Sequence, residues 1–419
     1  MNITAVVVGS TGDVEPFIVL GKELKRRGYD YSIATFQQYK PDIEKAGLGY
    51  KLIEGDIGMM MKTLLTKREG DSKKSGKNGL TRVLEAHPNL WNNMKAAMKN
   101  TDLVIYMQFG ALAYHFAEKM KIPAVRTFVF PSDPTRQYSV LGIPRPRNSF
   151  GSWLNYVIGA YVMNTATMDT AKLWRKKLGL SGWNRFSSYK KMNGKRITTL
   201  YQYSDVIAPR DPKWKSHIHL TGPWMDVEDE YIPSKELEDF LAAGEAPLYI
   251  GFGSMMYDKM DELQKMIISA LEKTGKRAIL NSSWSKFTKT DNPNIYYSDY
   301  IPFGWLFKRV KAVVHHGGCG TTHLGVAAGK PTLIMSFGAD QNFWGSQIHY
   351  LGLGPEHINV FAGEVTEEIL IKRFKELDNP MYTKNAEKAS ERLKNDGGVK
   401  EAADIIEGLF RRERKNGKH

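Results

Sequence analysis

The sequence is poor in the features that mark secreted and membrane-spanning proteins. Its 419 residues include one cysteine, Cys319, which excludes an internal disulfide framework and fits a reducing compartment. No apolar run approaches the ~20 residues that a helix needs to span a bilayer. The first residues, MNITAVVVGSTGD, lack the basic segment and the cleavage site of a signal peptide. We therefore expect a cytoplasmic protein.

Acidic residues are scarce relative to basic ones. Lysine and arginine total 59 against 45 aspartate and glutamate residues, a formal net charge of +14. This excess would attract phosphates, nucleic acid or an anionic membrane face. Because the charge is spread along the whole chain, a lysine-rich solvated surface explains it equally well. No D-x-D triplet occurs, so the carboxylate pair that often clamps a metal ion against a diphosphate is not evident.

What the sequence does contain is a strong alternation of strand and helix patterns. ITAVVVG has the pattern of a buried strand, EPFIVLGKELKRRG that of a helix, and YDYSIATF that of a second strand. The alternation recurs from TDLVIYMQF and restarts at APLYIGFGSM, after the proline-containing APRDPKWKSHIHLTGPW. At 419 residues the chain exceeds the roughly 250 to 300 residues of a single core. We predict the α/β class, with two tandem Rossmann-like domains that face each other across a cleft.

The predicted boundaries follow these patterns. An N-terminal domain covers residues 1–207, a linker 208–224, a C-terminal domain 225–390, and a final helix with a basic tail 391–419. Within the first domain, TKREGDSKKSGKNG (66–79) is polar and basic enough to be a mobile loop, and a solvated loop without a partner is its simplest interpretation.

The most unusual stretch is VVHHGGCGTTHLGVAAG, which places three histidines and Cys319 within nine residues. His316, Cys319 and His323 have zinc-like separations, but they fall on a strand end, a glycine turn and the start of a helix, so we expect no metal. A glycine turn that opens a helix suits a phosphate, because the first amides of a helix are unpaired and carry positive potential. A turn that merely reverses the chain fits the motif equally well.

Two further turns carry polar residues at the ends of predicted strands. GSTGDVEPF contains only G-x-x-G, and the second strand ends without an acidic residue, so a dinucleotide site is disfavoured. This turn puts Asp13 at the carboxyl edge of the sheet, although capping of the helix is the simpler explanation of that residue. Asp340 and Gln341 follow PTLIMSF at another edge, where they suit a polyhydroxyl ligand or are merely solvated.

Taken together, these residues resemble a known family. GSTGDVEPF is similar to the motif GSRGDVQPF/Y, and HHGGCGTT…AGKPTLIMSFGADQNFWG to HHGGAGTT…AGxPxxxxPFFGDQxFWG, of the inverting, metal-independent glycosyltransferases with two Rossmann domains, the GT-B architecture. The resemblance covers nearly the whole chain. DQNFWG, IPFGWLF and AEKMKIPAVRTFVFPSDPTR look most like the sterol glucosyltransferase branch. Macrolide and glycopeptide glycosyltransferases share the first and last motifs more loosely and are the second possibility.

The resemblance implies a role for each matching residue. Asp13 would be the general base, with Ser10, Thr11 and Gly12 beside it, and Asp340 and Gln341 would bind sugar hydroxyls. The diphosphate would be held by Gly253, Ser254, His316, Gly318, Cys319, Gly320, Thr321 and Thr322. The uracil would lie against Ile301, Pro302 and Trp284. No metal or other cofactor is implied. Phe303 and Gly304 replace a polar pair of the family, and Leu324 stands where some plant members bind ribose with a glutamate, which leaves nucleotide and sugar preference open.

The implied reaction moves a hexose, with glucose as the first candidate, from a UDP-sugar to a hydroxyl of an apolar acceptor such as a sterol or another lipid alcohol. No nucleic acid is expected as a partner. The acceptor pocket would lie in the N-terminal domain around YMQFG, TFVFPSDPTR and WLNYVIGAYVM (153–163), although an ordinary buried helix explains the last segment equally well. Peripheral membrane contact through loop 66–79, aromatic residues and the basic tail is a further expectation. A UDP-sugar epimerase, a silent nucleotide-sugar binding protein and an oxidoreductase fit fewer of the motifs.

Overall fold

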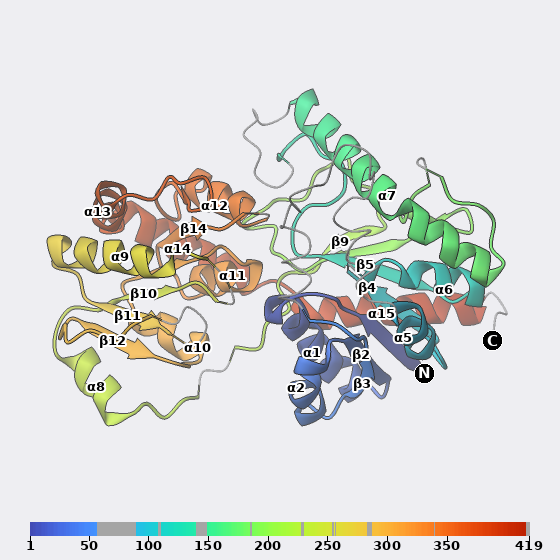
Figure 1. Ribbon diagram of the computed structural model, residues 1–419, viewed down its shortest axis with the longest axis horizontal. Coiled ribbons are helices and arrows are strands. Elements are labelled where there is room, and N and C mark those ends of the chain that lie inside the picture. Colours follow the sequence, from blue (N-terminus) through green and yellow to red (C-terminus); the bar gives the residue numbers. More distant parts are fainter. Residues whose placement is uncertain are drawn as a thin grey trace.

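Two α/β domains make up the protein, each built on one parallel sheet with helices around it (Figure 1). The computed structural model describes residues 1–56, 89–107, 110–139, 149–184, 187–227, 230–253, 255, 257–282, 287–338 and 340–415. The predicted α/β class with two Rossmann-like halves is confirmed. Several predicted residues lie outside the described ones: Ser254, Trp284, the loop 66–79, Gln108 and Phe109 of YMQFG, and the last four residues of the tail.

The N-terminal sheet has seven strands in the order β3-β2-β1-β4-β5-β8-β9, all parallel. Its apolar strands are buried on both faces, as Ile3, Val6 and Ile105 illustrate, because helices cover both sides of the sheet. The elements are β1 Asn2–Val6, α1 Thr11–Arg26, β2 Asp30–Thr35, α2 Lys40–Lys45, β3 Gly49–Leu52, α5 Leu90–Ala97, β4 Leu103–Tyr106, α6 Ala113–Met120, β5 Ala124–Phe128, α7 Phe150–Leu178, the hairpin β6 Lys191–Met192 and β7 Lys195–Arg196, β8 Thr198–Tyr201 and β9 Ile218–Leu220.

The C-terminal sheet repeats the design with six parallel strands in the order β12-β11-β10-β13-β14-β15. The elements are α8 Lys235–Ala242, β10 Leu248–Gly251, α9 Met260–Thr274, β11 Ala278–Asn281, β12 Ile295–Ser298, α10 Phe303–Leu306, β13 Ala312–His315, α11 Cys319–Ala327, β14 Thr332–Ser336, α12 Gln341–Tyr350, β15 Ile358–Asn359, α13 Glu367–Glu376, α14 Pro380–Leu393 and α15 Gly398–Lys415. The strand order reverses direction between β1 and β4 in the first sheet and between β10 and β13 in the second. Ligands of open α/β sheets bind outside the carboxyl ends of the strands at such reversals.

The segment 208–224, predicted as the linker, contains the last strand of the N-terminal sheet. β9 pairs in parallel with β8, with Thr199 opposite Ile218 and Tyr201 opposite Leu220. The preceding turn is fixed by Arg210, whose guanidinium donates to the backbone oxygens of Trp214 and Lys215 at 2.9 Å. The chain therefore returns to the first sheet before it enters the second domain.

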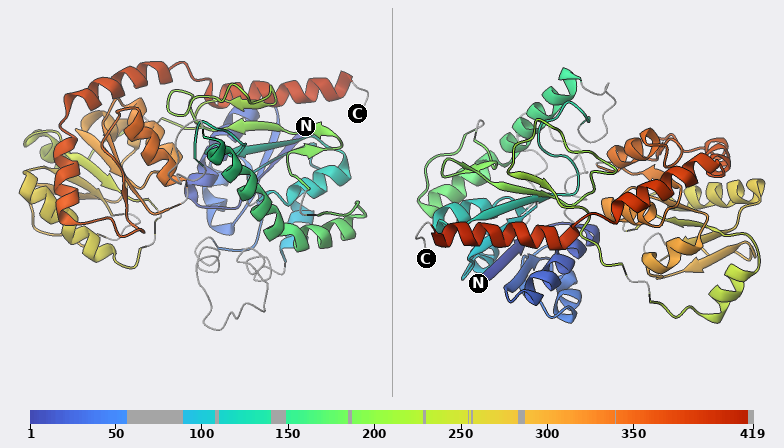
Figure 2. Two further views of the ribbon diagram at one scale, coloured as in Figure 1. Left: turned by 90° about the horizontal axis from the view of Figure 1, so that it is seen from above. Right: turned by 180° about the vertical axis from the view of Figure 1, so that it is seen from behind.

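The last helix, α15, lies along the N-terminal domain although it follows the C-terminal one (Figure 2). Ala403, Ile406 and Phe410 on α15 belong to the buried core of the N-terminal domain. Arg27, at the end of α1, donates to the Asp404 carboxylate at 2.6 Å and to the backbone oxygen of Lys400 at 3.0 Å. The two domains are thus joined by a second, C-terminal connection besides 208–224.

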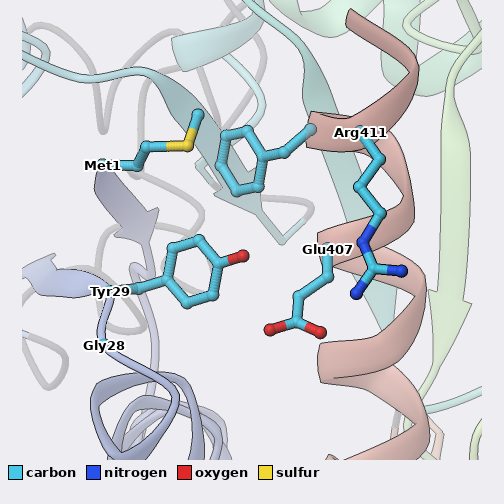
Figure 3. A pocket seen from close by; sticks show the side chains of 6 residues that line it. Met1, Gly28, Tyr29, Glu407 and Arg411 are labelled. Carbon is cyan, nitrogen blue, oxygen red and sulfur yellow. The ribbon is translucent and has the colours of Figure 1, made fainter. Parts of the chain in front are cut away.

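A pocket between α15 and the start of the chain is visible in Figure 3, where the Tyr29 ring faces the helix. Its lining comprises Met1, Gly28, Tyr29, Glu407, Phe410 and Arg411, with the rings of Tyr29 and Phe410 stacked at 5.6 Å. Met1 and Gly28 precede β1 and β2, so the pocket lies at the amino ends of these strands. It is therefore on the opposite side of the sheet from the carboxyl ends, where we look for the site.

Candidate functional site

Asp13 occupies the first turn of α1, directly after the carboxyl end of β1. One oxygen of its carboxylate accepts hydrogen bonds from the amide and the hydroxyl of Ser10, at 2.7 and 2.9 Å. Asp13 therefore caps the helix, as the simpler interpretation of the sequence expected. Burial nevertheless outweighs these two hydrogen bonds and raises the pKa of Asp13 above its ordinary value. A carboxylate with a raised pKa is better suited to accept a proton than a solvated one.

Two neighbours of Asp13 escaped the sequence analysis. A Cβ at Gly9 would lie 2.3 Å from the Asp13 carboxylate oxygen, so only glycine at position 9 leaves room for this side chain. Tyr39 donates its hydroxyl to the backbone oxygen of Gly9 at 3.2 Å. Burial raises the pKa of Tyr39, and the charge of Asp13 contributes to the same shift. The first glycine of GSTGD was a readable signal for this crowding, whereas nothing in the QQYKPD stretch indicated that Tyr39 would be near.

The predicted phosphate turn follows β13 and opens α11. Gly317 has φ of +95°, which only glycine adopts readily, and a Cβ there would lie 2.7 Å from Ile334. A Cβ at Gly318 would lie 2.6 Å from Nε2 of His316, and one at Gly253, after β10, would lie 3.1 Å from its Cε1. The His316 ring is therefore enclosed by two glycines from the two strands at the reversal point of the sheet.

His316 is held as a neutral ring in this turn. Burial lowers its pKa to about 4, so at neutral pH one ring nitrogen carries a hydrogen and the other does not. Its Nδ1 has no hydrogen-bond partner among the residues that the structure describes. A neutral imidazole with an unused nitrogen beside the first amides of a helix can donate one hydrogen bond to an anion without adding a charge.

The two threonines of the turn differ in their availability. Thr322 is fully buried and donates its hydroxyl to the backbone oxygen of Gly318 at 2.9 Å. Thr321 is partly exposed on the first turn of α11, next to the exposed Gly320. Thr321 is thus the hydroxyl that faces outward, while Thr322 closes the start of the helix.

The other two histidines of the motif hold the protein together. His315 accepts a hydrogen bond from the amide of Gly317 on Nδ1 at 3.0 Å. His323 has Nδ1 2.7 Å from the backbone oxygen of Cys319, and its Nε2 accepts from the amide of Ser204 at 3.1 Å. Burial lowers the pKa of His323 to about 4, which keeps Nε2 available as an acceptor. Within the described ranges, no group of three or more His, Cys, Asp or Glu side chains is placed to hold a metal ion.

Asp340 and Gln341 stand at the start of α12, after β14. Gln341 accepts from the amide of Phe337 at 2.6 Å and donates to the Met255 sulfur at 3.1 Å, so its side chain shapes the turn. Burial and, to a smaller extent, the negative charge of Asp13 together raise the pKa of Asp340 to about 7. The two carboxyl groups therefore interact across the junction of the domains, and the charge of Asp13 opposes ionisation of Asp340.

The predicted uracil contacts are only partly described. Ile301 is buried in a cluster that includes Trp305 and Phe307, and Pro302 precedes α10 as its capping residue. Phe303, one of the two departures from the family pattern, stacks on Phe307 with ring centroids 4.7 Å apart. The side chain of Ile301 thus packs into the core, so a base at this segment would meet its backbone.

A buried cluster shared by both domains lies beside the turn. Tyr203, after β8, packs edge-on against Trp344 of α12 at 5.6 Å, and Tyr138 packs in the same way against Phe343. The side-chain amide of Gln347 donates to the backbone oxygen of Ile207 at 3.1 Å. Together with the bond between Ser204 and His323, these contacts fix the phosphate turn relative to the N-terminal domain.

The TFVFPSDPTR segment, predicted to line the acceptor pocket, contains buried ionic contacts. Asp133 pairs with Arg126 and lies 3.1 Å from the Lys190 ammonium. Burial by itself would raise the pKa of Asp133, but these cations lower it to about 2. The Tyr201 hydroxyl donates to the same carboxylate at 2.8 Å. These polar groups are occupied within the domain, so an acceptor in this region would meet the apolar residues of the segment.

Two family models match the chain in its two halves. Residues 3–139 match the "Glycosyltransferase family 28 N-terminal domain", and residues 276–409 match the "Erythromycin biosynthesis protein CIII-like, C-terminal domain". The first match contains Asp13, and the second contains the phosphate turn and Asp340. The motifs that carried the resemblance are therefore the ones inside the matched regions.

Curated relatives match over almost the whole chain. A sterol 3-beta-glucosyltransferase of Arabidopsis thaliana is 30% identical over 98% of this chain, and one of Candida albicans is 31% identical over 97%. The chain spans 65% of the length of the plant relative and 27% of the fungal one. Among solved structures, a calicheamicin glycosyltransferase superposes with a TM-score of 0.71 at 17% identity, covering 98% of both chains. That likeness concerns the fold.

Proposed function

Because this chain belongs to the glycosyltransferases built from two Rossmann-like domains, we propose that it transfers a hexose, glucose first, from a UDP-sugar to a hydroxyl of an apolar acceptor such as a sterol or another lipid alcohol. The observation that carries the proposal is the electrostatic interaction between Asp13 and Asp340, which come from different domains. It supports a mechanism in which Asp13 acts as the base beside a diphosphate held by the turn of the other domain.

In this proposal Asp13 accepts the proton of the acceptor hydroxyl. An ordinary aspartate, with a pKa near 3.9, is a weak base for an alcohol until the alcohol becomes acidic during the displacement. The raised pKa of Asp13 narrows this gap. Ser10 orients the carboxylate through its amide and hydroxyl, and Thr11 and Gly12 would line the cleft beside it. A single displacement at the anomeric carbon inverts its configuration.

The leaving diphosphate is received by the turn after β13. Negative charge grows on it as the glycosidic bond breaks, and the N-terminus of α11 and the neutral His316 oppose that charge. Gly253, Gly318, Cys319, Gly320 and Thr321 would provide backbone or hydroxyl contacts, each good donor being worth ~3 kcal/mol in the transition state. Thr322 would contribute indirectly, by holding the helix start. No metal ion is part of this mechanism.

The remaining contacts concern the sugar and the base. Asp340 would accept hydrogen bonds from sugar hydroxyls, and Gln341 would fix the turn that presents Asp340. The uracil would lie against the backbone at Ile301 and Pro302, with Ser254 and Trp284 as further contacts predicted from the sequence. We also propose that the protein works as a cytoplasmic enzyme in peripheral contact with a membrane, since a lipid alcohol resides there. None of the described helices is long and apolar enough to cross one.

The proposal is tested by a product screen. The full chain is incubated with UDP-glucose, UDP-galactose, UDP-N-acetylglucosamine and thymidine diphosphate glucose, each against sterols, other lipid alcohols and polyketides, and hexosylated products are identified by mass spectrometry. We expect a UDP-sugar and a lipid alcohol to give the product, with a β linkage from an α-linked donor. A polyketide product from a thymidine diphosphate sugar would instead support a natural-product glycosyltransferase, and transfer to none of them would overturn the proposal.

A further inference from the structure

The first half of α7 exposes an apolar face to solvent. Apolar side chains recur at positions 150, 153, 154, 157, 158, 161 and 162, the spacing of a single helix face, and all of them are exposed. Phe150, Ile158 and Val162 are each at least half exposed, at 58%, 50% and 55%. The opposite face, which packs on the protein, carries the buried Ser152, Tyr156 and Asn164. We call the seven exposed residues the α7 stripe.

The α7 stripe corrects one expectation for this segment. The segment does not form an ordinary buried helix, because its apolar face is the outer one. The inner face is held by the buried Tyr156 and by Asn164, which accepts from the Trp183 indole at 2.9 Å and donates to the backbone oxygen of Asn184 at 3.0 Å. Solvent exposure of a contiguous apolar face is costly, and such a face usually marks an interaction site.

The charged residues of α7 and its surroundings lie beyond the two ends of the stripe. No charged residue occurs from Phe150 to Met168, and the helix then carries one acidic residue, Asp169, and four basic ones. Lys172, Lys176 and Lys177 of these are exposed. At the other end, the Arg136 guanidinium lies 5.7 Å from the centre of the Phe150 ring. The apolar stripe is therefore bounded by cations at both ends, which complements an anionic leaflet.

The dimensions of the stripe favour a helix that lies in the surface over one that crosses. From Phe150 to Val162 the helix is about 18 Å long, at 1.5 Å per residue, which is too short for a span. Figure 1 shows the start of α7 at the outer edge of the N-terminal domain, above the region where the two domains meet. Residues in contact agree with this placement: Arg136 touches Phe150, and Tyr138, two residues later, packs against Phe343 of the C-terminal domain.

We infer that the α7 stripe docks the protein on an anionic lipid bilayer, with the helix in the plane of the headgroups and its lysines on the lipid phosphates. This inference deepens the proposed function, because it would place the opening between the domains next to the source of a lipid acceptor. The surface itself rests on the exposed residues and their flanking charges and needs no assumption about the sugar or the acceptor.

Vesicle sedimentation tests the inference with the full chain. The variant Leu154→Ser, Ile158→Ser, Val162→Ser removes three exposed side chains and should lower binding to phosphatidylglycerol–phosphatidylcholine vesicles at least about tenfold. The matched control Val227→Ser, Ile232→Ser, Met381→Ser removes three exposed aliphatic side chains elsewhere and should bind as the parent does. Equal binding of both variants and the parent would overturn the inference.

A site-specific label separates docking from other effects. The native Cys319 is buried, so a thiol-reactive environment-sensitive dye attaches selectively to the variant Val157→Cys. Its emission should shift to the blue when anionic vesicles are added, whereas the same dye on Ile232→Cys should not respond. An unchanged spectrum at position 157 would contradict membrane docking. A blue shift that grows with protein concentration in the absence of vesicles, together with a dimer in light scattering, would show instead that a second copy of the chain covers the stripe. If the product screen fails while vesicle binding and the blue shift at position 157 persist, the proposed acceptor is overturned but the membrane-docking surface is not.

Discussion

The turn after β1 and the turn after β13 are both glycine-containing, both open a helix and both lie at a reversal of strand order, yet they present opposite chemistry. The first turn places the Asp13 carboxylate in the first turn of α1, where burial raises its pKa. The second turn places the neutral His316 and free helix amides at its surface, with no acidic residue in the first turn of α11. In the proposed mechanism, one topology thus supplies the proton acceptor in one domain and the anion site in the other.

Glycine does different work in the two turns. Gly9 provides space for the carboxylate, whereas Gly253 and Gly318 enclose a ring. Substitutions in either turn test this difference, and replacing the Asp13 carboxylate is expected to have the largest effect on turnover.

Asp13→Asn should lower turnover by about 10² to 10⁴-fold, the usual contribution of a general base. Asparagine keeps a side-chain oxygen that can accept from Ser10, so the cap on α1 and the fold should persist. Steady-state kinetics with the product found in the screen measures the loss, and the melting temperature serves as the control for folding. A variant with turnover near that of the parent would remove Asp13 from its role.

Gly318→Ala should weaken UDP binding and turnover by about 10²-fold, because the new Cβ would lie 2.6 Å from Nε2 of His316 and displace the ring from its donor position. The matched control is Gly408→Ala in α15, away from the site, where a Cβ meets nothing within 4 Å. Calorimetry with UDP compares the two variants. Equal affinities in both would show that the enclosure of His316 has no part in binding.

The bond between His323 and Ser204 should make stability depend on pH. The pKa of His323 is about 4 in the folded protein, below the ordinary value of about 6.5, so the unfolded chain binds the proton first as pH falls. This group's contribution is complete above pH 6.5 and is lost as pH falls toward 4, at about 1.4 kcal/mol per pH unit. His115 and His316, with pKa values lowered by burial to about 3 and about 4, act in the same direction.

His323→Gln should therefore reduce the slope of unfolding free energy against pH by about one proton, since glutamine offers an acceptor to Ser204 but does not titrate in this range. His323→Ala should lower stability at pH 7 by about 1 to 3 kcal/mol, because it leaves the buried amide of Ser204 without its acceptor. Denaturant titrations between pH 4.5 and 7.5 provide both numbers. A slope identical to that of the parent in the glutamine variant would mean that His323 is protonated in the folded state.

The smallest expected effect concerns the coupling of the two carboxyl groups. The charge of Asp13 is one of the two causes that raise the pKa of Asp340, so Asp13 is already ionised when Asp340 titrates. Asp13→Asn should therefore lower the pKa of Asp340, because it removes that charge, and NMR titration of the aspartate carboxyl carbons measures the change. An unchanged pKa of Asp340 in the variant would show that the two groups do not interact.

The sequence was sufficient for the features that are local. Buried strands read as apolar runs, and both functional turns were placed correctly at strand ends because glycines and polar residues follow those runs within a few positions. The family resemblance was confirmed for the same reason, since its motifs are contiguous. The roles of the individual site residues stay predictions until they are measured.

What the sequence could not supply depends on distant partners. His323 meets Ser204 across 119 positions, and nothing near either residue announces the contact. β9 has three residues inside a segment with prolines, and it is a strand only because β8 pairs with it. A buried helix was one of two interpretations of 153–163, but which face of α7 is buried depends on the space that the domain offers to Ser152, Tyr156 and Asn164.

The most direct test of separate roles for the two turns measures UDP affinity by calorimetry and turnover by product formation in Asp13→Asn and Gly318→Ala. We predict that Asp13→Asn binds UDP within about twofold of the parent while its turnover falls by about 10² to 10⁴-fold. Gly318→Ala should lose affinity and turnover together. If Asp13→Asn lost UDP affinity as strongly as Gly318→Ala, or kept full turnover, the division of labour between the two turns would be contradicted.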